Sequence, residues 1–224
     1  MIVLVFDLDD TLYKELDFVM GGFRDTAKFL QNEYSLSKEK SFFLMKQELK
    51  NGRGKIFNNI LKRYDIYNKT ILNKCIKIYR THNPRIKLYI SAKKFLTKFT
   101  DFPIYIVTDG NKNVQKSKIN ALGLQKRIKF SYLTSNYGLK NSKPSTYCFS
   151  KICEREKVQP KNVIYIADDP SKDFVNLKKH GFKTIRVLTG KYKNRKFQKE
   201  FEADFTVKSL SDLSHKVIKE LIGK

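Results

Sequence analysis

The sequence contains little of what builds disulfide-linked scaffolds, metal-cluster proteins or low-complexity chains. Its 224 residues include three cysteines, five prolines, ten glycines and no tryptophan. Cys75, Cys148 and Cys153 form no CxxC pair, and this spacing argues against both a disulfide framework and a structural zinc site. An odd number of thiols is typical of a reducing compartment.

A long hydrophobic run is also missing. The apolar opening, Ile2–Phe6, is far too short for a membrane span or a signal-peptide core, and no basic segment precedes it. We therefore expect no membrane partner and a cytoplasmic location. A hydrophobic content of 41% and an aromatic content of 13% predict globular folding, with room for one domain and a sizeable insertion.

Acidic residues are scarce relative to basic ones. Lys and Arg number 46 against 22 Asp and Glu, which gives a formal net charge of +24. A basic surface attracts anions, including nucleic acid and phosphorylated metabolites. The lysines are spread along the chain, however, and no RNP-like aromatic pattern, zinc-finger spacing or basic zipper is present. Compositional bias explains the charge equally well, so nucleic acid is not the favoured partner and is not excluded.

Short β-rich runs alternate with helix-like stretches along most of the chain, which predicts a doubly wound α/β fold with a parallel sheet. The expected strands are Ile2–Phe6, Pro103–Val107, Phe130–Thr134, Asn162–Ala167, Lys183–Leu188 and the weaker Asp204–Val207. The expected helices between and after them are Asn113–Ala121, Ser145–Glu156, Ser171–His180 and Ser211–Leu221.

One long helical block interrupts this alternation directly after the first strand. Apolar residues recur at helical spacing through the block, and no strong strand breaks it. We therefore predict a helical insertion at residues 15–83, within a core formed by residues 1–14 and 84–224.

Polar clusters follow four of the expected strands. In a doubly wound sheet, ligands bind beyond the carboxyl ends of the strands. Carboxylates that converge there would repel one another and raise each other's pKa, so a cation should hold them, and Mg²⁺ prefers such oxygen ligands. The clusters are Asp7, Asp9, Asp10 and Thr11, then Thr108, Asp109 and Gly110, then Lys143, and finally Asp168, Asp169 and Asp173.

These clusters resemble the four motifs of the haloacid dehalogenase (HAD) superfamily, in particular its phosphatases with a helical cap inserted after the first motif. DLDDT, starting at Asp7, resembles the DxDxT motif, Thr108 resembles the second motif, and Lys143 with Pro144 resembles the third. The run from Asp168 to Asp173 is similar to the acidic fourth motif. The order and the place of the insertion also agree. Two departures, Asp10 and Ala167 where many relatives carry glycine, remove no functional group.

The resemblance implies a role for each motif residue. Asp7 is expected to be the nucleophile, and Asp9 the general acid and base. The Thr108 hydroxyl, the Asp109 amide and the Lys143 ammonium are expected to bind the phosphoryl group. Mg²⁺ is expected to be bound by Asp7, Asp168 and the Asp9 backbone carbonyl. Asp173 is expected to orient Lys143, with Asp169 as a further support. The possible substrate contacts are Tyr13, Lys14, Glu15, Phe18 and Arg24.

The implied activity is Mg²⁺-dependent hydrolysis of a small phosphorylated metabolite, such as a sugar phosphate, a nucleotide or an organic acid phosphate. An aspartate at position 9 argues against dehalogenation, which uses no general acid there. A phosphosugar mutase and a nucleic-acid 3′-phosphatase favoured by the basic surface stay open as alternatives, as does a degenerate binding protein. We expect a monomer or a weak homodimer.

Overall fold

A computed structural model describes residues 1–223 of the chain. The chain divides into two compact units. One, the α/β unit, comprises Met1–Glu15 together with the chain from Ile86 onward, and the other, the helical unit, comprises Leu16–Arg85. Across residues 1–223, no helix combines the length and the hydropathy needed to cross a membrane.

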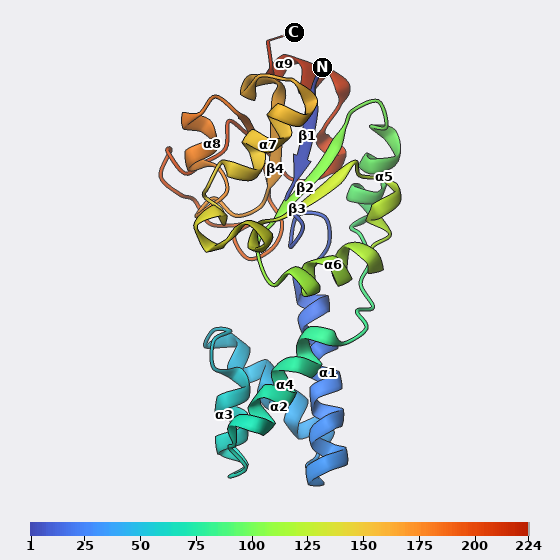
Figure 1. Cartoon of the computed structure of the whole chain (residues 1–224), viewed down its shortest axis with the longest axis vertical. Helices are drawn as coiled ribbons and strands as arrows, with labels where there is room; N and C mark the ends of the chain where they lie inside the picture. Colours follow the sequence, from blue (N-terminus) through green and yellow to red (C-terminus); the bar gives the residue numbers. More distant parts are fainter. Residues whose placement is uncertain (224) are drawn as a thin grey trace. The chain divides into compact units, whose positions relative to one another are not determined.

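The α/β unit is built on one parallel sheet of six strands in the order β3-β2-β1-β4-β5-β6. β1 lies in the interior of the sheet, and its four residues are fully buried because both faces are covered. The predicted doubly wound parallel sheet is therefore confirmed (Figure 1). The strands are β1 (Val3–Phe6), β2 (Ile104–Thr108), β3 (Phe130–Leu133), β4 (Val163–Ala167), β5 (Lys183–Val187) and β6 (Phe205–Val207).

Helices cover both faces of this sheet. On one face, Phe149 and Ile152 of α7 and Leu177 of α8 pack in a common cluster with alternate residues of the strands. On the other face, Phe95 of α5 meets Phe6 of β1, with ring centroids 5.5 Å apart. Figure 1 shows α7 and α8 on the opposite side of the sheet from α5. The helices are α5 (Ile90–Lys98), α6 (Lys112–Ala121), α7 (Tyr147–Glu156), α8 (Val175–Lys179) and α9 (His215–Leu221).

Two predicted helices are shorter than the sequence pattern indicates. The expected helix Ser171–His180 is reduced to α8, because the preceding residues form a loop held by carboxylates. Asp169 Oδ1 accepts a hydrogen bond from the Ser171 amide at 3.0 Å, and Asp173 Oδ2 accepts one from the Asp169 amide at 3.2 Å. These side-chain bonds hold the turn before α8 and leave residues 171–174 outside the helix. The expected helix Ser211–Leu221 is divided into a 3₁₀ turn at Leu210–Asp212 and α9.

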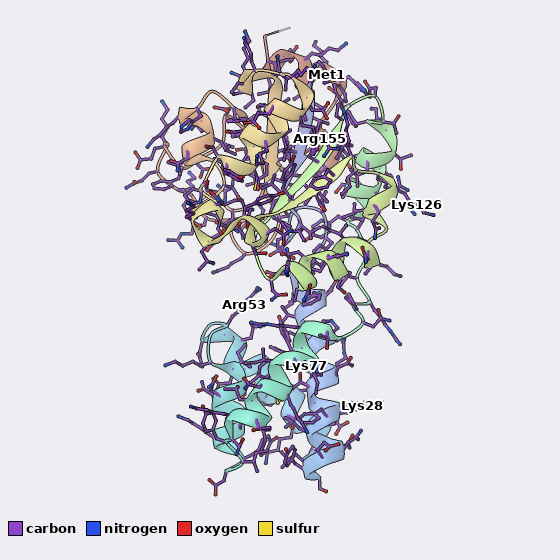
Figure 2. All side chains as sticks on the ribbon, viewed as in Figure 1. Met1, Lys28, Arg53, Lys77, Lys126 and Arg155 are labelled. Carbon is purple, nitrogen blue, oxygen red and sulfur yellow. The ribbon has the colours of Figure 1, made fainter. Side chains whose placement is uncertain are left out.

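The helical unit has its own apolar core. Val19, Phe23 and Leu30 of α1 contact residues of the other three helices, including Leu44 and Ile60. Its function as a cap stays a prediction. Figure 2 shows long basic side chains projecting from both units, including the exposed Lys28, Lys77 and Lys126. The four helices are α1 (Glu15–Tyr34), α2 (Lys38–Lys50), α3 (Ile56–Arg63) and α4 (Lys69–Thr81).

Candidate active site

The first motif follows β1 at the carboxyl edge of the sheet, beside the ends of its two neighbours. Phe6 pairs with Ile106 of β2 and with Ile166 of β4, so the three strands end within two residues of one another along the sheet. The Asp7 amide donates a hydrogen bond to the Ile166 carbonyl at 3.0 Å. Asp7 is therefore fixed by the ladder itself and is only 3% exposed.

Lys143 is the cation of this edge, and it contacts Asp7 directly. Its ammonium lies 2.7 Å from Asp7 Oδ1 and 2.9 Å from Asp173 Oδ1, and it donates to the Tyr165 hydroxyl at 3.0 Å. Burial acts to lower the pKa of Lys143, but Asp173 and Asp7 outweigh it and raise that pKa well above its usual value. Lys143 is therefore held in its charged form, and its ammonium forms ion pairs with both carboxylates.

Three buried carboxylates, Asp7, Asp168 and Asp173, lie close enough to share one cation, with a ligand atom of each within 4.8 Å of the others. Burial, reinforced by Asp7 and Asp173, raises the pKa of Asp168 to about 9. Burial likewise raises the pKa of Asp7 to about 6, although Lys143 opposes it. A raised pKa at a cluster of hard oxygen donors indicates that positive charge is in deficit there, which fits a divalent cation such as Mg²⁺.

Asp9 is held by a clamp of three donors, Tyr13, Gln115 and Lys118. Lys118 Nζ lies 2.7 Å from Asp9 Oδ1, and the Tyr13 hydroxyl donates to the same oxygen. The Gln115 amide nitrogen donates to Asp9 Oδ2 at 2.9 Å. Burial acts to raise the pKa of Asp9, but Lys118 and the hydrogen bonds outweigh it and lower that pKa. Asp9 is thus held as a carboxylate in this conformation.

The second motif is tied to the clamp and to the third motif. The Gln115 amide nitrogen that contacts Asp9 also donates to Thr108 Oγ1 at 2.7 Å. Asp109 Oδ1 accepts bonds from Thr134 Oγ1 at 2.7 Å and from the Lys143 amide at 3.1 Å. The Asp109 side chain therefore fixes the loops after β2 and β3, while its backbone amide was the group predicted to bind phosphate.

Comparison with known proteins decides the family. Residues 4–187 match the haloacid dehalogenase-like hydrolase family, and this match spans more than half of the chain. The chain belongs to the haloacid dehalogenase-like hydrolases. It is thus an enzyme, and the resemblance inferred from the four motifs is confirmed.

Individual relatives agree with this assignment to the HAD-like hydrolases. A glyceraldehyde 3-phosphate phosphatase of Methanocaldococcus jannaschii is 27% identical over 220 residues, covering 94% of each chain. Another of that name from Methanopyrus kandleri is 23% identical over 201 residues, covering 85% of each. A HAD hydrolase of Bacillus subtilis, solved with magnesium bound, has a TM-score of 0.67 at 18% identity and covers 96% of this chain and 97% of its own. The predicted enzyme class, a phosphoric monoester hydrolase, agrees with these findings.

Asp10, one of the two departures from the motif pattern, has a backbone conformation that glycine would also adopt. Its φ is 55°, in the left-handed region that aspartate tolerates better than most residues. Its carboxylate accepts a hydrogen bond from the Glu15 amide at 2.9 Å. Gly190 packs so closely that a Cβ atom there would lie 2.5 Å from the Asp10 Cβ. Gly190 therefore makes room for the side chain of Asp10.

The predicted substrate contacts do not form one exposed group. Tyr13 is fully buried against Asp9, and Phe18 is 2% exposed and packs on the His82 ring. Both rings are enclosed by neighbouring side chains in this conformation, and their role as substrate contacts stays a prediction. Lys14 and Arg24 are exposed and Glu15 is half-buried, with the Arg24 guanidinium 5.6 Å from the Phe42 ring centroid.

Several site residues escaped the sequence analysis, which considered mainly the residues at strand ends. Gln115 and Lys118 lie on α6, beside Val114 and Ile119 on its buried face. Polar residues on the apolar face of an expected helix are the signal that would have found them. Tyr165 was hidden inside an apolar strand, and no pattern distinguished its hydroxyl from a packing residue.

Proposed function

We propose that this chain is a Mg²⁺-dependent phosphatase that hydrolyses a small phosphorylated metabolite through an aspartyl-phosphate on Asp7. The observation that carries the proposal is the position of Asp7. Its carboxylate is buried, lies 2.7 Å from the Lys143 ammonium and belongs to the three-carboxylate group. A pKa of about 6 leaves it ionised at neutral pH, as a nucleophile requires.

In the first step an oxygen of Asp7 attacks the substrate phosphorus, and the bond from phosphorus to the ester oxygen breaks. Asp9, in its protonated form, gives its proton to the departing oxygen, so that an alcohol leaves. Lys143 and Thr108 stabilise the phosphoryl oxygens as their charge is redistributed. General acid catalysis of this kind contributes about 10²–10⁴-fold.

In the second step Asp9 works in reverse. As a carboxylate it takes a proton from water, and the resulting hydroxide attacks the phosphorus of the aspartyl-phosphate. The bond between phosphorus and the Asp7 oxygen breaks, which releases inorganic phosphate and restores both side chains. The donors around Asp9 lower its pKa, which keeps the carboxylate ionised between the two steps and free to accept this proton.

Asp7 and Asp168 would hold the Mg²⁺ ion with the Asp9 backbone carbonyl, and Asp173 lies within the same group of carboxylates. When bound, the ion would reduce the repulsion between the Asp7 carboxylate and the phosphate dianion. Thr11 donates to Asp168 Oδ1 at 3.2 Å and orients that ligand. Lys143 keeps Asp173 and Asp7 in place when the ion is absent.

Glyceraldehyde 3-phosphate is the first substrate to test, because relatives that match 94% and 85% of this chain carry its name. The helical unit would act as the cap that selects the leaving group. A nucleic-acid 3′-phosphatase is the second candidate, since the net charge of +24 attracts polyanions. Both candidates use the same catalytic residues.

A panel of phosphate esters assayed with Mg²⁺ tests the proposal and separates the candidates. Glyceraldehyde 3-phosphate, glycerol 3-phosphate, nucleoside monophosphates and a 3′-phosphorylated oligonucleotide are the informative members. We expect Asp9→Asn to lower kcat/KM for the best alkyl ester by about 10²–10⁴-fold, since asparagine cannot carry the proton. Equal turnover by wild type and Asp9→Asn would contradict the assignment of Asp9. Turnover of the oligonucleotide alone, falling steeply with salt, would select the second candidate.

The carboxylate group also predicts how pH affects stability and Mg²⁺ binding. Folding raises the pKa of Asp168 from 3.8 to about 9. Protonated Asp168 therefore stabilises the folded metal-free protein, and this contribution is complete below the lower pKa. That contribution is lost as the pH rises toward the upper value. Mg²⁺ must displace the bound proton. We therefore expect a fixed Mg²⁺ concentration, a hundred times the Kd at pH 8, to raise Tm by about 5–10 °C at about pH 8 and by much less at about pH 6.

Thermal melts at the two pH values, with and without Mg²⁺, measure this difference. Asp168→Asn is the control variant, because it removes the titrating ligand and should abolish most of the Mg²⁺ effect at both pH values. A Tm shift independent of pH, or one that survives in Asp168→Asn, would show that Mg²⁺ binds elsewhere.

A further inference from the structure

The donors around Asp9 distinguish its two carboxylate oxygens. Oδ1 accepts from Lys118 Nζ at 2.7 Å and from the Tyr13 hydroxyl. Oδ2 accepts from Gln115 at 2.9 Å. A carboxylate offers about four lone-pair sites, two on each oxygen. Three donors therefore occupy both sites of Oδ1 and one site of Oδ2, which leaves the second site of Oδ2 for a proton.

We infer that Lys118 is the positioning residue of Asp9, and that with Tyr13 it engages Oδ1 so that Oδ2 is the oxygen that exchanges the proton. This inference rests on the proposed function. In the first step Oδ2 passes its proton to the ester oxygen as the phosphorus–oxygen bond breaks. In the second step the same oxygen takes a proton from water. Lys118 acts only through Asp9 and touches neither the substrate nor the phosphorus.

Gln115 directs the working oxygen toward the phosphate side. Its amide nitrogen contacts both Asp9 Oδ2 and Thr108 Oγ1, the latter at 2.7 Å. Oδ2 and the hydroxyl predicted to bind a phosphoryl oxygen are thus bridged by one nitrogen. Rotation of the Asp9 carboxylate would break the Gln115 bond and both bonds at Oδ1, so the three donors together select one orientation.

Burial makes Lys118 well suited to this role. Its side chain is 4% exposed, whereas that of Asp9 is 22% exposed. The Nζ atom also lies 5.9 Å from the centroid of the Tyr13 ring, within the range of a cation–π interaction. The partly exposed Asp9 can thus meet substrate and water while the buried cation anchors it from behind.

Lys118→Met tests the inference, because methionine keeps a long apolar side chain and removes the charge and the donors. Lys116→Met is the matched control, since Lys116 is exposed on the same helix. The measurement is kcat and KM for glyceraldehyde 3-phosphate, an alkyl ester, and for p-nitrophenyl phosphate, whose leaving group needs no acid. Should another alkyl ester of the panel turn over faster, it replaces the first.

For Lys118→Met we expect kcat/KM for the alkyl ester to fall by about 30- to 100-fold, carried by kcat, because a misplaced catalytic group costs about that much. The loss of kcat/KM for the aryl ester should be at least about fivefold smaller. The value of kcat/KM reflects steps only up to the transfer of the phosphoryl group to Asp7, and for an aryl ester that transfer needs no general acid. Lys116→Met should match wild type. In the Asp9→Asn background, Lys118→Met should add less than about a twofold loss, because its effect passes through Asp9.

Equal losses on both esters, or a full further loss in the Asp9→Asn background, would overturn the inference. Tyr13→Phe is a second test, because it removes only the hydroxyl that donates to Asp9 Oδ1. This variant should also lose more activity on the alkyl ester than on the aryl ester, by a smaller factor than Lys118→Met. Wild type that turns over neither ester with Mg²⁺ refutes the proposed function and this inference together. Active wild type with a clear Asp9→Asn defect and an unaffected Lys118→Met variant refutes the inference alone.

Discussion

The Asp7→Asn variant is expected to lose phosphate ester turnover by a factor on the order of 10⁴ to 10⁶, the scale seen when a covalent nucleophile is removed. An asparagine amide carries no charge and forms no stable bond to phosphorus. The backbone of residue 7 is held by the Ile166 carbonyl at 3.0 Å, so the amide side chain should occupy the same place without rebuilding the site. Initial rates with Mg²⁺ measure the loss.

A trapping experiment separates loss of the nucleophile from loss of folding. Rapid acid quenching followed by mass spectrometry should detect a phosphorylated peptide containing residue 7 in wild type and none in Asp7→Asn. Asp25→Asn, at an exposed position of α1, should behave as wild type. A phosphopeptide that persists in Asp7→Asn would place the nucleophile elsewhere and end the proposed mechanism.

The Lys143→Met variant is expected to lose both turnover and stability. Removing one partner of a buried ion pair typically destabilises a protein by about 3–5 kcal/mol. The side chains of Lys143, Asp7 and Asp173 are 2%, 5% and 0% exposed, so the two carboxylates would have no solvent to replace the cation. Urea denaturation of the metal-free protein at about pH 8, above the pKa of about 6 for Asp7, measures the effect.

Two further variants identify the cause of that loss. Lys140→Met, at an exposed position shortly before Lys143, should leave the free energy of unfolding within about 0.5 kcal/mol of wild type. Lys143→Met combined with Asp173→Asn should recover part of the stability, because one of the two buried carboxylates that lost their cation is removed. Turnover should stay lost in this double variant. If the double variant is no more stable than Lys143→Met, charge imbalance is not the reason for the destabilisation.

The sequence predicted the sheet well because parallel strands buried on both faces leave an unmistakable pattern. Runs such as Ile2–Phe6 and Asn162–Ala167 are apolar at nearly every position, and the strands β1 and β4 lie within them. The helix ends were predicted less well. The segment before α8 is helical by composition, yet the side chains of Asp169 and Asp173 hold its backbone in a loop.

Within the site, the residues at strand ends were predictable and the residues that hold them were not. Asp7, Asp168 and Lys143 stand in motifs that signal their chemistry. Lys118 resembles any of the many lysines of the chain, and its burial depends on how α6 packs, which helical spacing alone does not determine. Tyr13 was considered only as a substrate contact, because its hydroxyl bond to Asp9 joins residues whose geometry depends on the turn after β1.

All the named partners of Asp7, Asp9, Thr108, Lys143 and Asp168 belong to the α/β unit. The chemistry is therefore modular: the reactive groups are assembled by one part of the chain, and the inserted helices at Leu16–Arg85 can diverge without disturbing them. With the helical unit in its proposed role as the cap, such an arrangement would let evolution change which molecule is accepted while the reaction is conserved. Under that proposal, an exchange of residues 16–85 with the corresponding helices of a relative is expected to retain the whole reactive framework and redirect it to another ester.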